Sequence, residues 1–177
     1  MKVGVIGVGA LGSLFGGCLQ LAKVDVSFIF KTLEKKILFD KKGLFINFQH
    51  QRYHIFPKTF LASELKNQFD IILIFTKTID TMIALHSIKK IIGLDTILMS
   101  LQNGLDNDLI LQNFVKPKNI IYGTTMVAAD QRAINKVFSF GNNLTYFKPK
   151  HHFSHKISQQ MYQEAQQADT QSSTKNE

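Results

Sequence analysis

The fold is decided by residues 2–12, KVGVIGVGALG, at the start of the chain. Residues 2–6 form a short apolar run that stops at a glycine, which is typical of a buried strand entering a tight turn. Residues 10–23 then carry apolar side chains at helical spacing, and residues 24–30 are rich in β-branched and aromatic side chains. The order predicts a strand–helix–strand unit of about 30 residues.

The turn of this unit has the pattern G-x-G-x-x-G, formed by Gly7, Val8, Gly9, Ala10, Leu11 and Gly12. In this pattern the first glycine permits the tight turn, the second lets the backbone approach a pyrophosphate, and the third lets the helix pack closely on the sheet. The N–H groups at the start of the helix would face the phosphates. We therefore expect these six residues to bind a dinucleotide. The alternative is a glycine turn with a purely structural role.

Beyond this unit, apolar strand-like runs alternate with segments of helical period. The expected strands are residues 70–75, 96–99 and 119–122, and the expected helices are residues 32–42, 78–92 and 105–114. This alternation predicts an α/β fold, a Rossmann-like doubly wound parallel sheet with its ligand site at the carboxyl ends of the strands.

Two parts of the chain depart from the alternation. Residues 44–48 and 53–56 are short alternating runs that predict a hairpin, and residues 124–148 predict further short β segments, which together form a small β extension of the sheet. Residues 151–177 are polar, so we expect a polar helix followed by a disordered tail.

A lysine, Lys31, follows the second expected strand. NAD-binding domains usually place Asp or Glu at this point to bind the ribose 2′-OH. A lysine attracts a 2′-phosphate instead, and Lys35 and Lys36 follow closely, so NADP(H) is favoured over NAD(H). The alternative is that Lys31 is only a solvated charge at a strand end.

Two more polar residues follow expected strands. Lys77 comes after the strand at 70–75, and Asn103, within Gln102-Asn103-Gly104, comes after the strand at 96–99. At the carboxyl edge of the sheet both can reach a nicotinamide ribose or a substrate carboxylate. Taken alone, such residues more often cap strands or form turns.

The charge and the composition limit the partners. The chain has 177 residues, 21 Lys and Arg against 13 Asp and Glu, a formal charge of +8, and one cysteine. The charge favours polyanions, but no nucleic-acid-binding motif is present, so we expect no nucleic-acid partner.

A single cysteine excludes an internal disulfide, and no apolar run is long enough for a membrane span. We therefore expect a cytoplasmic protein. His152 and His155 lack acidic or cysteine ligands nearby, so no metal site is expected.

Taken together, the motifs resemble a known family. The order of the glycine turn, Thr76-Lys77, Gln102-Asn103-Gly104 and residues 123–129, GTTMVAA, resembles the N-terminal domain of ketopantoate reductases, also called 2-dehydropantoate 2-reductases. The resemblance covers nearly all of residues 1–148. It implies an NADP-binding Rossmann-like domain over residues 1–150.

The resemblance also implies roles for single residues. The glycine turn would hold the pyrophosphate, Lys31 would recognise the 2′-phosphate, and Lys77 would lie along the cofactor. Asn103 would lie where nicotinamide and substrate meet, and so would bind both. Ala129 would contact the cofactor mainly through its backbone.

The implied activity is the reduction of 2-dehydropantoate to pantoate by NADPH, in pantothenate biosynthesis. Such a reaction needs a general acid near the keto oxygen. In the family this is a lysine of a helical C-terminal domain, and this chain lacks the corresponding pattern, since Lys175 lies in a polar stretch without an apolar helix. We therefore expect the helical domain to be absent and assign no catalytic residue.

Three expectations follow from an absent helical domain. The chain alone would bind the cofactor without turnover, and a small 2-oxoacid would bind only when a helical domain complements it. The apolar surface left uncovered would favour self-association. The alternative function is a non-catalytic module that binds or senses NADPH.

Overall fold

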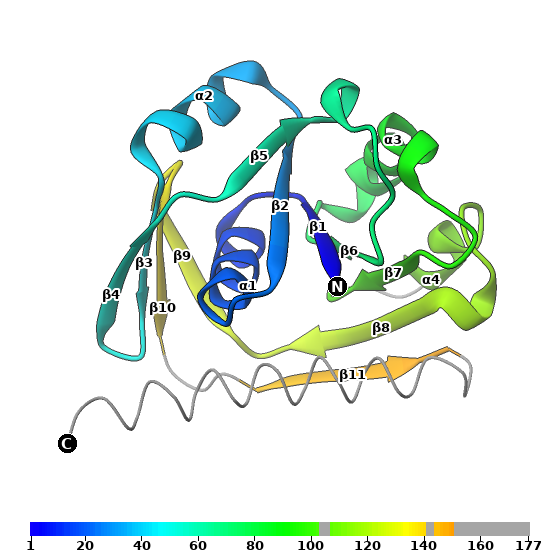
Figure 1. Ribbon diagram of the computed structural model, residues 1–177. Helices are drawn as coiled ribbons and strands as arrows, with labels where there is room; N and C mark the ends of the chain where they lie inside the picture. Colours follow the sequence, from blue (N-terminus) through cyan, green and yellow to red (C-terminus); the bar gives the residue numbers. More distant parts are fainter. Residues whose placement is uncertain (103–106, 141–143, 151–177) are drawn as a thin grey trace.

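The computed structural model describes residues 1–102, 107–140 and 144–150. The larger of its two sheets has seven strands in the order β11-β8-β7-β6-β1-β2-β5 (Figure 1). Their bounds are β1 Lys2–Ile6, β2 Asp25–Phe30, β5 Lys58–Leu61, β6 Ile71–Ile74, β7 Ile97–Ser100, β8 Ile120–Thr125 and β11 Thr145–Pro149. Neighbouring strands run parallel, except that β11 is antiparallel to β8.

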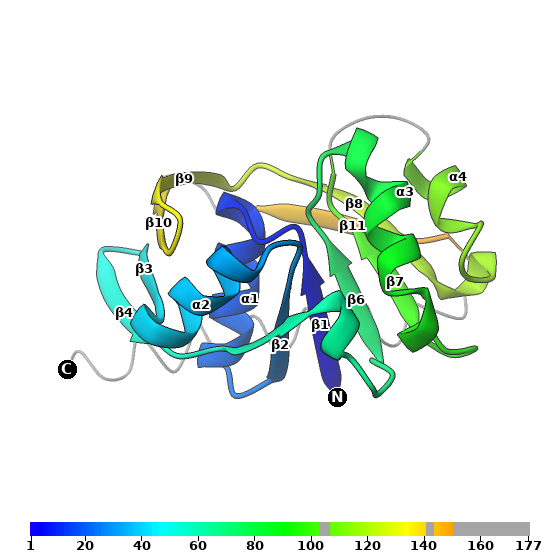
Figure 2. The ribbon, with the colours of Figure 1, turned by 90° about the horizontal axis from the view of Figure 1, so that it is seen from above.

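Helices cover both faces of this sheet (Figure 2). They are α1 Ala10–Leu21, α2 Leu33–Lys42, α3 Thr78–Ser87 and α4 Asn107–Leu111, with short 3-10 turns η1 Ala62–Glu64, η2 Lys89–Ile91 and η3 Pro117–Asn119. Strand β6 shows why both faces need cover, because every one of its side chains is apolar and buried. Ile71 and Leu73 pack on the side of α1, whereas Ile72 and Ile74 pack with Leu85 of α3. The predicted doubly wound α/β fold is confirmed.

The smaller sheet has four strands in the order β4-β3-β10-β9. Their bounds are β3 Leu44–Phe48, β4 Gln51–Ile55, β9 Ala128–Ala133 and β10 Lys136–Phe140. Strands β3 and β4 form the predicted hairpin, which turns through Gln49 and His50 with φ of 48° and 62°. Strand β10 pairs in parallel with β3, so segments far apart in sequence complete one sheet.

Helix α1 lies between the two sheets. A Cβ on Gly16 would lie 2.6 Å from the Phe28 ring of the larger sheet, and one on Gly17 would overlap Ile46 of the smaller sheet. Only glycine at these positions allows both sheets to approach the helix closely. The larger of the two hydrophobic cores therefore runs through α1 into both sheets.

Several elements differ from the sequence-based expectations. Strand β5 was not expected, and the helix expected over residues 78–92 ends at Ser87, where the 3-10 turn η2 follows. The expected β extension divides, because β11 joins the larger sheet while β9 and β10 join the hairpin. The polar helix and tail expected over residues 151–177 lie outside the described residues. None of the helices in the described ranges is long and apolar enough to cross a membrane.

Candidate functional site

The candidate site lies where β1 and β6 end side by side. Strand β1 continues through α1 to β2 on one side, whereas β6 continues through α3 to β7 on the other side. Such a reversal of strand order leaves a crevice beyond the carboxyl ends of the two strands, and ligands of doubly wound folds bind there. The glycine turn follows β1, and Lys77 follows β6, at this edge.

The glycine turn is compact because glycines stand where a side chain would not fit. Gly7 has φ +80°, and an added Cβ would overlap the backbone nitrogen of Thr76. An added Cβ on Gly12 would overlap the carbonyl oxygen of Gly7. The Gly9 N–H donates to that same carbonyl at 2.7 Å. Hence the turn packs under the end of β6, and α1 begins directly after it.

Gly9 lies on the open side of the turn. Apart from Gly9 and its two chain neighbours, no described residue has an atom within 4 Å of a Cβ built on it. It is the N-cap of α1, no side chain hydrogen-bonds to this helix end, and the first turn contains no acidic residue. Helix N-termini have backbone N–H groups without intrahelical partners and carry a partial positive charge. This open, uncapped glycine turn fits a pyrophosphate.

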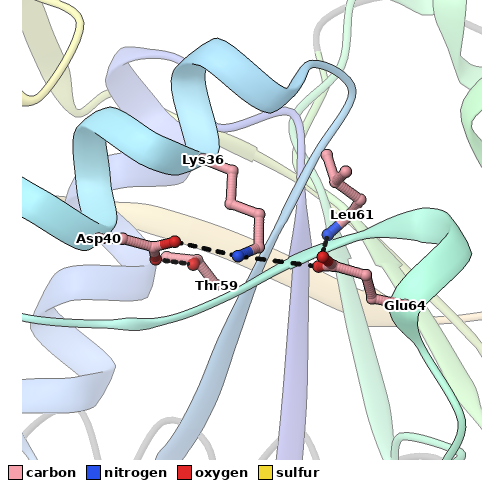
Figure 3. A network of polar contacts seen from close by, with 5 residues as sticks. All are labelled: Lys36, Asp40, Thr59, Leu61 and Glu64. Atoms are coloured by element: carbon pink, nitrogen blue, oxygen red, sulfur yellow. Dashed lines mark hydrogen bonds and ion pairs between the residues drawn. The ribbon is translucent and has the colours of Figure 1, made fainter.

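Lys31 and Lys36, which follow β2, lie in different environments. Lys31 is exposed at the end of β2. The Lys36 ammonium instead lies 3.0 Å from Asp40 and 3.9 Å from Glu64, and its side chain is 17% exposed (Figure 3). The hydrogen bond to Asp40 raises the pKa of Lys36. Of the cations expected near a 2′-phosphate, Lys36 is thus already neutralised by two carboxylates.

The two carboxylates around Lys36 hold α2 against the edge of the larger sheet (Figure 3). Asp40 accepts a hydrogen bond from Thr59 of β5, and Glu64 accepts one from the Leu61 N–H at 2.8 Å. Burial acts to raise the pKa of Asp40, but the bonds from Thr59 and Lys36 hold it below its ordinary value. Lys36 therefore has a structural role in this network.

Gln102 connects the ends of β7 and β6. Its amide nitrogen donates to Thr81 Oγ1 at 2.7 Å and to the backbone carbonyl of Thr76. Its amide oxygen accepts from the Ser100 hydroxyl at 2.9 Å. The Thr76 and Thr81 hydroxyls are themselves 2.9 Å apart. Gln102 thus fixes the turn that carries Lys77, a role that the sequence analysis did not assign to it.

The remaining predicted residues lie around this edge. Lys77 is exposed at the N-cap of α3, and its carbonyl accepts the Asp80 N–H at 2.9 Å and the Thr81 hydroxyl at 3.2 Å. Ala129 lies in β9, pairs with Ser139, and belongs to the residues packed on the core around α1. Asn103 lies outside the described residues. The structure therefore brings Lys77 and the glycine turn to the same edge.

A comparison with protein families agrees with this geometry. The family model described as ketopantoate reductase PanE/ApbA matches residues 3–151. The chain belongs to the ketopantoate reductase PanE/ApbA family. Curated relatives of this ketopantoate reductase family member include the 2-dehydropantoate 2-reductases of Archaeoglobus fulgidus, 31% identical over 146 residues, and of Lactococcus lactis, 29% identical over 144 residues. The matches cover 82% and 80% of this chain and 46% of each relative, so the chain spans about half their length.

Solved structures of other proteins show the same fold. A D-mandelate dehydrogenase in complex with NADH and anilino(oxo)acetate superposes with a TM-score of 0.87 at 27% identity, over 96% of this chain and 55% of that one. The 2-dehydropantoate 2-reductase of Geobacter metallireducens superposes with a TM-score of 0.86 at 20% identity, over 96% and 56%. The second likeness concerns the fold alone.

Proposed function

We propose that this chain binds NADPH and supplies the cofactor-binding half of an enzyme that reduces 2-dehydropantoate to pantoate. The observation that carries the proposal is the open, uncapped glycine turn at the point where the strand order reverses. Membership of the ketopantoate reductase family and the names of the curated relatives support it. A cytoplasmic location suits a chain with one cysteine, because that compartment disfavours disulfides.

The choice of NADPH over NADH rests on Lys31. Lys31 is exposed at the end of β2, where NAD-binding domains usually carry Asp or Glu. An acidic residue at this position would repel a 2′-phosphate, whereas the lysine ammonium attracts it. Lys36 contributes little to this choice because Asp40 and Glu64 neutralise it. The D-mandelate dehydrogenase that superposes on this chain holds NADH, so the preference needs a direct measurement.

The reaction divides between the cofactor and the protein. Bound NADPH supplies a hydride to the keto carbon. The backbone of residues 7–12 holds the diphosphate, Ala129 contacts the cofactor through its backbone, and Lys77 places its ammonium at the edge where ribose and substrate meet. Asn103, one residue after Gln102, is proposed to bind nicotinamide and substrate together. No described residue is assigned as the proton donor, and a helical domain is proposed to complete the substrate site.

The test of cofactor choice is the substitution Lys31→Asp, with Lys89→Asp of η2 as the matched control. A charged hydrogen bond contributes about 1.5–3 kcal/mol, so NADPH affinity should fall about tenfold or more while NADH affinity changes little. Calorimetric titration measures both affinities. Equal losses for the two nucleotides would contradict the role of Lys31.

A turnover assay with 2-dehydropantoate separates the reductase from the alternative function. We expect this chain alone to bind NADPH without turnover. Turnover by the chain alone would contradict the assignment of proton donation to a helical domain. If the chain binds NADPH but adding a helical domain does not restore reduction of 2-dehydropantoate, the result favours a module that binds or senses NADPH.

Self-association is a further part of this proposal. Ile79 and Ile83 lie one turn apart on α3 and are 84% and 65% exposed. Contiguous apolar surface of this kind favours contact with a partner. Sedimentation at high protein concentration should therefore detect a dimer, and a monomer throughout the concentration range would contradict self-association.

A further inference from the structure

The outer face of the smaller sheet carries aromatic and basic side chains. Its inner face is apolar and packs on α1 through Leu44, Ile46 and Val137, which are buried. Because side chains alternate along a strand, the neighbours of these residues point outward. We name this outer surface the aromatic–basic face and define it by Phe45, His54, Phe56, Arg132, Lys136 and Phe140.

The rings of this face are exposed and arranged in rows. Phe45 stacks on His54 of the neighbouring strand, with centroids 4.0 Å apart and planes within 8°. The His54 and Phe56 centroids are 4.9 Å apart. Phe45, Phe56 and Phe140 are 37%, 60% and 50% exposed. Strand β4 is at the edge of the sheet, so a planar ligand can extend the stack beyond His54.

Cations accompany the rings. Lys136 Nζ lies 5.6 Å from the Phe45 centroid, and Arg132 Cζ lies 4.3 Å from that of Phe138. Lys41 and Lys42, at the end of α2, line a groove together with Phe45 and Lys136.

The charge of this surface is unbalanced. The described residues that line the groove include lysines 41, 42 and 136 and no carboxylate. On the sheet itself, the Asp130 carboxylate lies 3.3 Å from the Arg132 guanidinium, so these two charges offset each other. The surface is therefore positive, and it fits a polyanion that also carries planar groups.

We propose that the aromatic–basic face binds single-stranded nucleic acid. Bases stack on the exposed rings, and phosphates pair with the three lysines of the groove, Lys41, Lys42 and Lys136. Four strands spaced about 4.8 Å apart span about 15 Å, and sheet faces of this size accommodate two or three stacked bases. This inference is independent of the proposed reductase function, because the glycine turn lies at the start of α1 and not on the outer face.

Other partners fit this face less well. Two copies of the face would bring like charges together, which disfavours self-pairing. Phe45, His54 and Phe140 lie on strands, and Phe56 directly follows β4, so the rings can stack on bases but cannot insert deeply into a lipid bilayer. The expectation of no nucleic-acid partner rested on sequence motifs, whereas this face assembles residues 41–56 with residues 130–140 through the pairing of β3 and β10.

The experiment is fluorescence anisotropy with a labelled oligouridylate of about 12 nucleotides, within the length that single-strand sites occupy. If three cations pair with phosphates, the slope of log affinity against log salt is about −2.1, and affinity falls about 20-fold between about 50 and 200 mM salt. Saturating NADPH should leave binding unchanged. Displacement by NADPH would place the oligonucleotide in the glycine turn and overturn the proposal.

Two variants, each with a matched control, test the residues. Phe140→Ala should weaken binding about tenfold or more through lost stacking, while Tyr146→Ala, which removes an even more exposed ring on β11, should not. Lys136→Gln should reduce the salt slope by about 0.7, while Lys89→Gln should not. Unchanged urea unfolding midpoints confirm folding.

Two further results would overturn the proposal. One is no binding of the oligonucleotide, whether or not phosphatidylserine vesicles capture the protein. The other is equal effects of the variants and their controls.

Discussion

Replacing Gly9 with alanine is expected to weaken dinucleotide binding while leaving the fold intact. Apart from the two chain neighbours, no described residue has an atom within 4 Å of the added methyl group, and the backbone of Gly9, with φ −98° and ψ −153°, is accessible to alanine. The fold should lose less than about 1 kcal/mol, mainly because alanine is a poorer N-cap than glycine. The methyl group would instead occupy the space proposed for the pyrophosphate.

The size of the binding defect follows from the hydrogen bonds that the methyl group prevents. Loss of one hydrogen bond to a charged phosphate costs about 1.5–3 kcal/mol, which is about 10- to 150-fold in affinity. Calorimetric titration with NADPH measures this loss, and urea denaturation measures the free energy of unfolding. Gly7→Ala is the matched control, since its φ of +80° and its overlap with Thr76 should cost at least about 2 kcal/mol of stability.

If Gly9→Ala binds NADPH as tightly as the unchanged chain, the open side of the turn does not face the cofactor. If Gly9→Ala unfolds as readily as Gly7→Ala, the space beside Gly9 is not open, as the prediction requires.

Three further substitutions test the structure. Gln102→Leu should lower the free energy of unfolding by about 1–3 kcal/mol, because it leaves partners at two strand ends unsatisfied, and chemical denaturation would show this. Asn135→Ala should cost a similar amount, since the Asn135 amide donates to the buried carbonyl of Gly43 at 2.8 Å; an unchanged unfolding midpoint would contradict it. Asp108→Asn should cost up to about 1 kcal/mol at pH 7, because the bond from Lys150 holds the pKa of Asp108 below its ordinary value. A lowered carboxyl pKa stabilises the fold above the pKa of the unfolded chain, so the difference between Asp108→Asn and the unchanged chain should vanish as pH falls through the folded pKa.

The parallel sheet was predictable because its strands are buried on both faces. Residues such as Ile72 and Leu73 must both be apolar, which leaves a continuous run that the sequence shows directly. Strand β5 lacks this signal, because Lys58 is exposed and the rest of the strand is only partly buried. Its place beside β2 depends on a pairing between distant segments.

The candidate site was predictable where its chemistry is local. The glycine turn is contained in six consecutive residues, and its context between a strand and a helix is readable from the sequence. The role of Lys36 was not readable, because Glu64 and the Asp40 partner Thr59 come from later segments. Gln102 had a usable signal, since it follows a buried strand just as Lys77 does, but its neighbour Asn103 was considered instead.

Calorimetric titration of the unchanged chain with NADPH and NADH tests most directly whether the glycine turn is a working dinucleotide site. We expect saturable binding of one NADPH per chain, with NADH binding more weakly. Absence of binding for both nucleotides would show that the glycine turn does not bind a dinucleotide.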